Sequence, residues 1–330
     1  MKARAGRTLF LILILLLLAL SLWLSLLIGA VPTSPRDLWD FLFNHNQAYR
    51  TIFLDLRLSR ALLAFLVGAC LSLSGAILQG YFQNPMADPF IIGVSSGASF
   101  GAVLCLFLGL ETTLVGFPLQ SIFAFASAFA LVSLVYLLSR KRDAHRVETL
   151  LLTGIAAGAM ASALTSFLLF SKSDSFEQAV FWLLGSFTLA DWRQVMAVAP
   201  YLVICLVIAQ WLAKDMNLIV LGDETAKALG SPVGGVRKAF LAVSTLLAAI
   251  SVAVSGIIGF VGLVVPHWVR ILVGPDHRRL FFLSSLTGGV FLVICDLLAR
   301  TLRAPSELPI GIITAAFGAP FFIYLLHRRR

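Results

Sequence analysis

Apolar runs long enough to cross a membrane occupy most of this chain of 330 residues. A helix needs about 20 residues to cross the roughly 30 Å hydrocarbon core of a bilayer. A soluble globular fold is excluded because hydrophobic residues make up 59% of the chain and charged residues only 12%, against about 25% in soluble domains. The sequence also lacks the short alternating segments of a transmembrane barrel. It therefore predicts an all-α, polytopic membrane protein with a single domain over residues 1–330.

Ten transmembrane helices are predicted from these runs. In chain order they are Leu9–Ile28, Arg60–Gly80, Phe90–Leu110, Phe117–Leu138, Thr149–Phe170, Val195–Leu212, Ala239–Gly256, Ile257–Val273, Phe281–Leu298 and Pro309–Leu326. The seventh and eighth form a nearly continuous stretch, about 50 Å long if helical, which is too long for one span. Ser255, Gly256 and Gly259 offer a break, so we expect a full helix followed by a shorter one.

The basic residues predict how these helices are oriented. If the N-terminus lies in the cytoplasm, 17 of the 25 Lys and Arg residues face inward and 8 face outward. Cytoplasmic loops carry such an excess of basic residues, so both termini and the loop of about residues 221–238 are predicted to be cytoplasmic. The net charge of +9 is explained by this topology. We therefore expect membrane lipid, and no nucleic acid, around the chain.

The polar segment Leu221–Pro232, LGDETAKALGSP, lies between two long apolar stretches. Asp223 is predicted as the N-cap of a small helix outside the bilayer, and Gly230 as its left-handed C-terminal stop. The Ser-Pro pair that follows is predicted to begin the next helix, with serine as its N-cap. The residues alone leave two interpretations open. The segment is either a solvated loop or a docking element for an ATP-hydrolysing partner.

A second notable segment reads NPMADP over Asn84–Pro89 and continues as GVSSGA over Gly93–Ala98. Pro85 and Pro89 stop the second helix, because proline lacks the backbone N–H and clashes with the preceding turn. The small residues that follow give the third span a face for close helix packing or for cargo.

The remaining reactive residue types predict structure rather than chemistry. The cysteines, all within apolar runs and without a C-x-x-C motif, are Cys70, Cys105, Cys205 and Cys295. We expect them to be small buried hydrophobes. The histidines are scattered, so no metal ligand and no cofactor is predicted, although a haem contact at His45 stays open. Asp296 lies four residues before Arg300, which favours a structural ion pair over an ion pathway.

Four stretches in order along the chain resemble the FecCD-type permeases, the membrane subunits of ABC importers for ferric siderophores, haem and cobalamin. They are NPMADPFIIGVSSGASFGA (Asn84–Ala102); FWLLGSF (Phe181–Phe187) with Asp191–Arg193; LGDETAKALG (Leu221–Gly230); and a C-terminal block made of GFVGLVVPHWVR (Gly259–Arg270), GPDHR (Gly274–Arg278) and ELPIGIITAAFGAPFFIYLL (Glu307–Leu326). The resemblance covers nearly all the chain after Arg57, and the first fifty residues match only in character.

The resemblance implies three functional regions. Coupling to a cytoplasmic ATPase is implied for Leu221, Gly222, Asp223, Glu224, Ala226, Lys227, Leu229 and Gly230. Docking of a periplasmic substrate-binding protein is expected at Arg57, Arg60, Arg300 and Arg303. A translocation pathway or gate is expected at Asn84, Pro85, Met86, Ser95, Ser96, Gly97, Val147 and Glu148.

The expected assembly is an importer in a bacterial inner membrane. Two permease chains, identical or related, would form the pathway, and two ATPase subunits would drive it. This chain has no G-x-x-x-x-G-K-[ST] motif for ATP and is predicted not to be an enzyme. A ferric siderophore is the favoured cargo, with haem and cobalamin as alternatives. A secondary transporter is less favoured because Asp296 is the only candidate midplane carboxylate.

Overall fold

The described part of the chain is built almost entirely from helices. The computed structural model describes residues 2–29, 33–43, 49–110, 112–114, 116–140, 146–171 and 176–328. His45 lies outside these ranges. The one sheet found in them is a small antiparallel pair of β1 (Thr113–Leu114) and β2 (Phe117–Pro118).

Ten helices correspond to the ten predicted spans. They are α1 (Lys2–Leu27), α3 (Ser59–Tyr81), α4 (Val94–Phe107), α5 (Leu119–Ser139), α6 (Arg146–Ser171), α8 (Trp192–Trp211), α11 (Val233–Ser255), α12 (Val261–Val273), α13 (His277–Thr301) and α14 (Ile310–Arg328). Over the described residues, seven helices are long and apolar enough to cross a membrane, and α4, α12 and α14 supply shorter apolar helices. The prediction of an all-α, polytopic membrane protein is confirmed.

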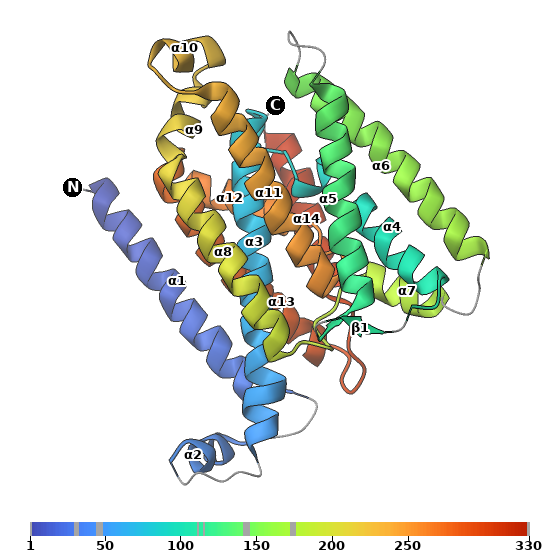
Figure 1. The fold of residues 1–330 in the computed structure, drawn as a ribbon. Coiled ribbons are helices and arrows are strands. Elements are labelled where there is room, and N and C mark those ends of the chain that lie inside the picture. Colours follow the sequence, from blue (N-terminus) through green and yellow to red (C-terminus); the bar gives the residue numbers. More distant parts are fainter. Residues whose placement is uncertain are drawn as a thin grey trace.

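Shorter elements connect these helices. They are α2 (Pro35–Phe43), the π-helix η2 (Thr51–Leu58), the 3₁₀-helix η3 (Pro89–Ile92), α7 (Phe176–Leu183), α9 (Ala213–Val220) and α10 (Asp223–Ala228). The elements α9 and α10 lie at one end of the bundle, towards which both described ends of the chain also point, whereas α2 and β1 lie at the opposite end (Figure 1). This arrangement agrees with the prediction that the termini and the loop 221–238 share one side of the membrane.

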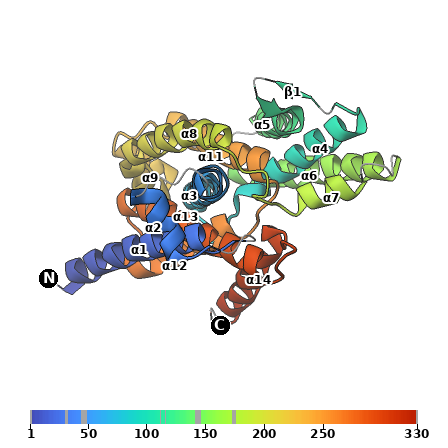
Figure 2. The same cartoon turned by 90° about the horizontal axis from the view of Figure 1, so that it is seen from below.

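Helix α3 is the centre of the bundle. Figure 2 shows it seen end-on and surrounded by other helices, and nearly all its residues are buried against α8, α11, α12 and α13. The helix continues from η2, so the second span begins at Thr51 and not at the predicted Arg60. Phe53 and Arg57, four residues apart in η2, both lie in the interior.

Two helix crossings bring α3 into backbone contact with its neighbours at glycine. A Cβ atom on Gly75 would lie 1.8 Å from the carbonyl oxygen of Gly262 in α12, and one on Gly68 would lie 2.2 Å from the carbonyl oxygen of Gly288 in α13. Small residues allow membrane helices to approach this closely. Any side chain at these points must force two backbones apart.

Replacing Gly75 by alanine is therefore expected to destabilise the detergent-purified protein by about 3 kcal/mol, the upper part of the range for overpacking. Thermal unfolding monitored by size-exclusion chromatography measures this effect. Gly235→Ala is the matched control, because Gly235 is an exposed helical glycine with nothing within 4 Å of a built Cβ. Equal midpoints for the two variants would contradict the close crossing of α3 and α12.

The predicted break between the seventh and eighth spans is confirmed. Helix α11 ends at Ser255, and Gly256 has φ +69°. A Cβ atom there would lie 2.1 Å from the carbonyl oxygen of Trp182, so both backbone conformation and space require glycine. The short helix α12 then starts at Val261.

Candidate functional site

A compact knob formed by α9 and α10 projects from one end of the bundle (Figure 1). The small helix α10 covers Asp223–Ala228, so the predicted helix in this segment is confirmed. Its N-cap, however, is Gly222 and not the predicted Asp223, and no side chain caps the helix. The Asp223 carboxylate instead accepts hydrogen bonds from Arg237 of α11, at 2.6 Å from Nη2 and 3.2 Å from Nε.

The C-terminal stop of α10 forms as predicted. Gly230 has φ +85°, Ser231 N–H donates to the carbonyl of Ala226 at 3.0 Å, and Gly230 N–H donates to that of Lys227 at 2.9 Å. These two bonds make a Schellman motif, which requires a left-handed residue. The prediction that Ser231 caps the next helix is wrong. Its hydroxyl donates to Asp215 at 2.8 Å, and α11 begins at Val233 after Pro232.

Polar contacts fasten the knob to three spanning helices. Besides holding Asp223, Arg237 donates from Nη1 to the carbonyl oxygen of Tyr81 in α3 at 2.9 Å, and its guanidinium lies over the Tyr81 ring. Asn217 of α9 donates to Asp276 at 2.8 Å and accepts from the backbone N–H of His277 at 3.0 Å, both at the start of α13. The knob is therefore attached to α3, α11 and α13 by side-chain contacts.

The outer surface of the knob is apolar at its tip and charged beside it. Leu221 and Leu229 are 68% and 62% exposed, and Glu224 and Lys227 form an exposed pair at 2.8 Å. Ala226, on the inner face of α10, is fully buried. Of the residues predicted to couple to the ATPase, it therefore packs the knob against the bundle and does not face outward. Two exposed leucines flanked by charges can fill a groove on another protein, and this surface has no reactive group.

A buried cluster of charges lies at the opposite end. Arg60 of α3 donates to Asp296 of α13 at 2.8 Å and to Glu307 at 2.9 Å, and Arg300 lies 3.3 Å from Asp296. The predicted ion pair between Asp296 and Arg300 is therefore confirmed. Arg300 also donates to Ser25 of α1 at 3.1 Å, so the cluster ties α1, α3 and α13 together.

Glu307, in the loop before α14, is the most accessible member of this cluster, with its side chain 31% exposed. Partial burial alone would raise the pKa of Glu307, but the hydrogen bond and charge of Arg60 outweigh burial and lower the pKa below its ordinary value of 4.5. The stabilisation from this pair is thus complete above pH 4.5 and is lost as the pH falls through the lowered pKa. Sequence reasoning missed the role of Glu307, whose partner Arg60 lies 247 residues away.

The four arginines predicted to dock a binding protein divide into two groups. Arg57, Arg60 and Arg300 are buried, and Arg57 donates to the carbonyl oxygens of Leu26 and Leu27. Only Arg303 of the four is exposed. Docking remains a prediction, and among the four arginines and the buried cluster the accessible groups are Arg303 and Glu307.

The residues predicted to form a pathway or gate lie on three segments, the turn after α3, α4 and α6, and their role stays a prediction. Asn84, Pro85 and Met86 form the turn after α3, where Met86 N–H donates to the Asn84 side chain at 3.0 Å. The exposed Glu148 and the half-buried Val147 start α6. Ser95, Ser96 and Gly97 lie in the first turn of α4, which begins at Val94. Ser96 accepts a hydrogen bond from Ser162 of α6 at 3.2 Å, whereas Gly97 packs against α5.

Comparison with known proteins gives consistent matches over nearly the whole chain. Residues 16–328 match the model of the FecCD transport family. The chain is 44% identical to the cobalamin import permease BtuC of Halobacterium salinarum over 87% of this chain and 76% of that protein. It is 38% identical to the Fe(3+) dicitrate permease FecD of Escherichia coli over 93% and 94% of the two chains.

Two further matches give the same picture. The hemin permease HmuU of Yersinia pestis is 38% identical, over 92% of this chain and 90% of that protein. A solved structure of an inward-facing metal-chelate type ABC transporter superimposes with a TM-score of 0.82 at 35% identity, covering 96% of this chain and 97% of that one.

Proposed function

The chain belongs to the FecCD transport family, the membrane subunits of ABC importers for metal chelates, and we propose that it carries a ferric siderophore across a bacterial inner membrane. The observation that best supports a role as the membrane subunit of an importer is the knob of α9 and α10. It is held by side-chain contacts to three helices and is apolar at its tip. It suits a subunit that is moved by a partner. The chain is a transporter subunit and not an enzyme.

The energy would come from a separate ATPase on the cytoplasmic side. A rigid element that packs into a partner transmits a domain movement as a shift of the helices attached to it. Through Arg237 and Asn217 the knob is attached to α3, α11 and α13, so a push on its leucines would reach the core of the bundle. The predicted cytoplasmic position of the knob supports this direction of coupling.

A second permease chain would complete the pathway. One face of α6 presents small and hydroxyl-bearing residues that are exposed in the single chain; these are Ala159, Ser162, Ala163 and Ser166. Small residues allow close helix contact, and hydroxyl groups suit a path for a polar cargo better than a surface against lipid tails. We therefore assign this face to the interface between two permease chains.

On the periplasmic side we propose that Arg303 contributes to docking of the substrate-binding protein. Arg303→Glu should weaken docking about fivefold at low ionic strength and much less at high salt, because exposed charges steer association and are screened. Binding of the purified partner to the permease in nanodiscs measures this. Unchanged affinity at low salt would remove Arg303 from the docking surface.

The cargo can be tested directly with the reconstituted importer. ATP-driven uptake of a ferric siderophore into proteoliposomes should exceed uptake of cobalamin and haem when the binding protein and ATPase are present. Cobalamin is the second candidate, because the relative from Halobacterium salinarum imports it. Uptake of cobalamin alone would leave the importer role intact and overturn the siderophore assignment.

A further inference from the structure

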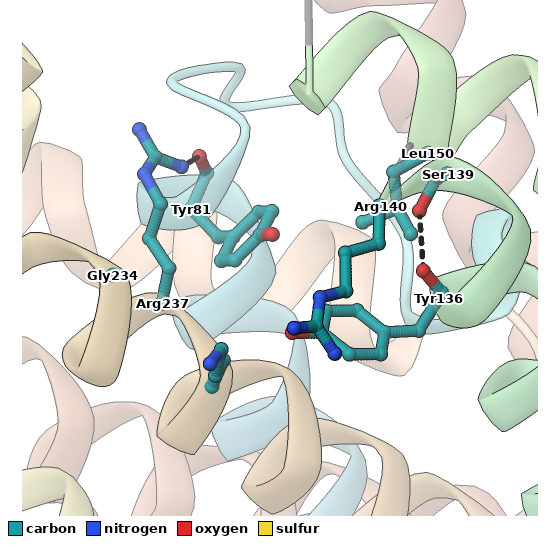
Figure 3. A pocket seen from close by; sticks show the side chains of 8 residues that line it. Tyr81, Tyr136, Ser139, Arg140, Leu150, Gly234 and Arg237 are labelled. Carbon is teal, nitrogen blue, oxygen red and sulfur yellow. Dashed lines mark hydrogen bonds between the residues drawn. The ribbon is translucent and has the colours of Figure 1, made fainter. Parts of the chain in front are cut away.

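A basic pocket lies between four helices at the α10 end of the bundle. Its lining includes Tyr81 of α3, Tyr136 of α5 and Arg140 directly after it, Leu150 of α6, and Arg237 and Lys238 of α11. In Figure 3, Arg140 and Tyr136 lie on one side of the pocket, and Tyr81 and Arg237 lie on the other. The pocket thus brings three cations and two tyrosine side chains together at a helix end.

The charge of this pocket is only partly neutralised. Asp223 pairs with Arg237 at 2.6 Å, whereas neither Arg140 nor Lys238 forms an ion pair with any residue that the structure describes. Both of these side chains belong to exposed residues. Three cations against one carboxylate leave two positive charges available to an anion.

An apolar groove continues from the pocket along the outside of α5 and α11. Its floor includes the buried Val132 and Leu241, and its rim the exposed Phe129 and Leu137. From Leu137 to Phe129 it extends about 12 Å along α5, at 1.5 Å per residue. Tyr136 and Lys238 line both spaces, so the basic pocket and the groove join at these side chains.

We propose that this combined site binds an anionic phospholipid. Arg140 and Lys238 hold the headgroup phosphate, and one acyl chain lies in the groove between α5 and α11. Charge and shape both favour this occupant, because a basic pocket between membrane helices recognises anionic headgroups and the attached groove is apolar. The headgroup then lies beside Arg237, which anchors the knob through Asp223.

Native mass spectrometry of the purified full chain tests the site. With phosphatidylglycerol and phosphatidylcholine of identical acyl chains added in equal amounts, phosphatidylglycerol should be retained preferentially. Each cation removed should reduce that preference roughly fivefold, the effect of one charge at an anionic membrane surface. Arg140→Gln combined with Lys238→Gln should therefore bring the two lipids close to equal retention.

Two further variants separate a lipid from other occupants. Ala242→Trp, at an exposed groove position, fills the groove and should reduce phosphatidylglycerol retention although both cations remain. Arg278→Gln combined with Arg279→Gln removes two exposed cations elsewhere at the same end and should leave retention unchanged. Equal retention of both lipids by the wild-type protein would overturn the proposal. Full retention by the double Arg140 and Lys238 variant, or displacement of the lipid by excess inorganic phosphate alone, would do the same.

Discussion

Replacing Leu229 by aspartate is expected to abolish ATP-driven uptake while the protein still folds and inserts. Leu229 is 62% exposed at the tip of the knob, so its side chain contributes little to the stability of the isolated chain. In the proposed complex it would be buried by the ATPase, and a carboxylate there would lose its hydration without gaining a partner. We expect Leu229 to be one of the few hot spots of this interface, where a change costs about 2 kcal/mol, which corresponds to a loss of affinity of about 30-fold.

Co-purification of the ATPase and uptake into proteoliposomes measure this effect together. The matched control is Leu272→Asp, because Leu272 is also 62% exposed but lies at the end of α12, outside the knob. That variant should retain the ATPase. Normal co-purification and uptake with Leu229→Asp would contradict the proposed contact. Loss of protein from the membrane would instead show that Leu229 supports the fold.

Removing the carboxylate of Asp296 is expected to have the largest effect on stability. Asp296 is 1% exposed and neutralises Arg60 and Arg300, which are themselves buried. Asp296→Ala leaves two guanidinium groups in the interior without their shared partner, and a broken buried pair costs about 3–5 kcal/mol. Asp296→Asn keeps an oxygen acceptor and should lose less.

The midpoint of thermal unfolding in detergent measures this prediction. Asp55→Ala is the control, because Asp55 is an exposed carboxylate in η2 and should change stability by less than about 0.5 kcal/mol. The same experiment separates a structural role from an ion pathway. If Asp296→Ala lost uptake at an unchanged midpoint, Asp296 would serve transport and not the fold.

Local signals in the sequence predicted the positions of the helices well and some of their ends. Apolar runs located the seven helices long enough to cross a membrane and the three shorter apolar helices, because burial in lipid requires an uninterrupted stretch of apolar residues. Gly230 and Gly256 correctly marked the ends of α10 and α11, since a backbone with positive φ strongly favours glycine. These features depend on neighbouring residues and are therefore visible in the order of the sequence.

Contacts between distant segments could not be predicted in the same way. Asp223 was expected to cap its own helix, but Arg237, which becomes a neighbour only after α11 folds back, provides a stronger partner. Arg60 was expected to face the periplasm, but it lies inside a helix that starts earlier and pairs with Asp296 across 236 residues. An arginine at the end of an apolar run has the same local pattern whether it faces water or a buried carboxylate.

The central claim is that the knob faces the cytoplasm, where an ATPase can reach it. Labelling of Leu229→Cys with a membrane-impermeant maleimide in intact and in permeabilised cells tests this claim directly. The background is low because Cys70, Cys105, Cys205 and Cys295 are all buried. We predict labelling only after permeabilisation, with protection when the ATPase is bound. Labelling in intact cells would place the knob outside, out of reach of the ATPase, and would contradict the proposed coupling.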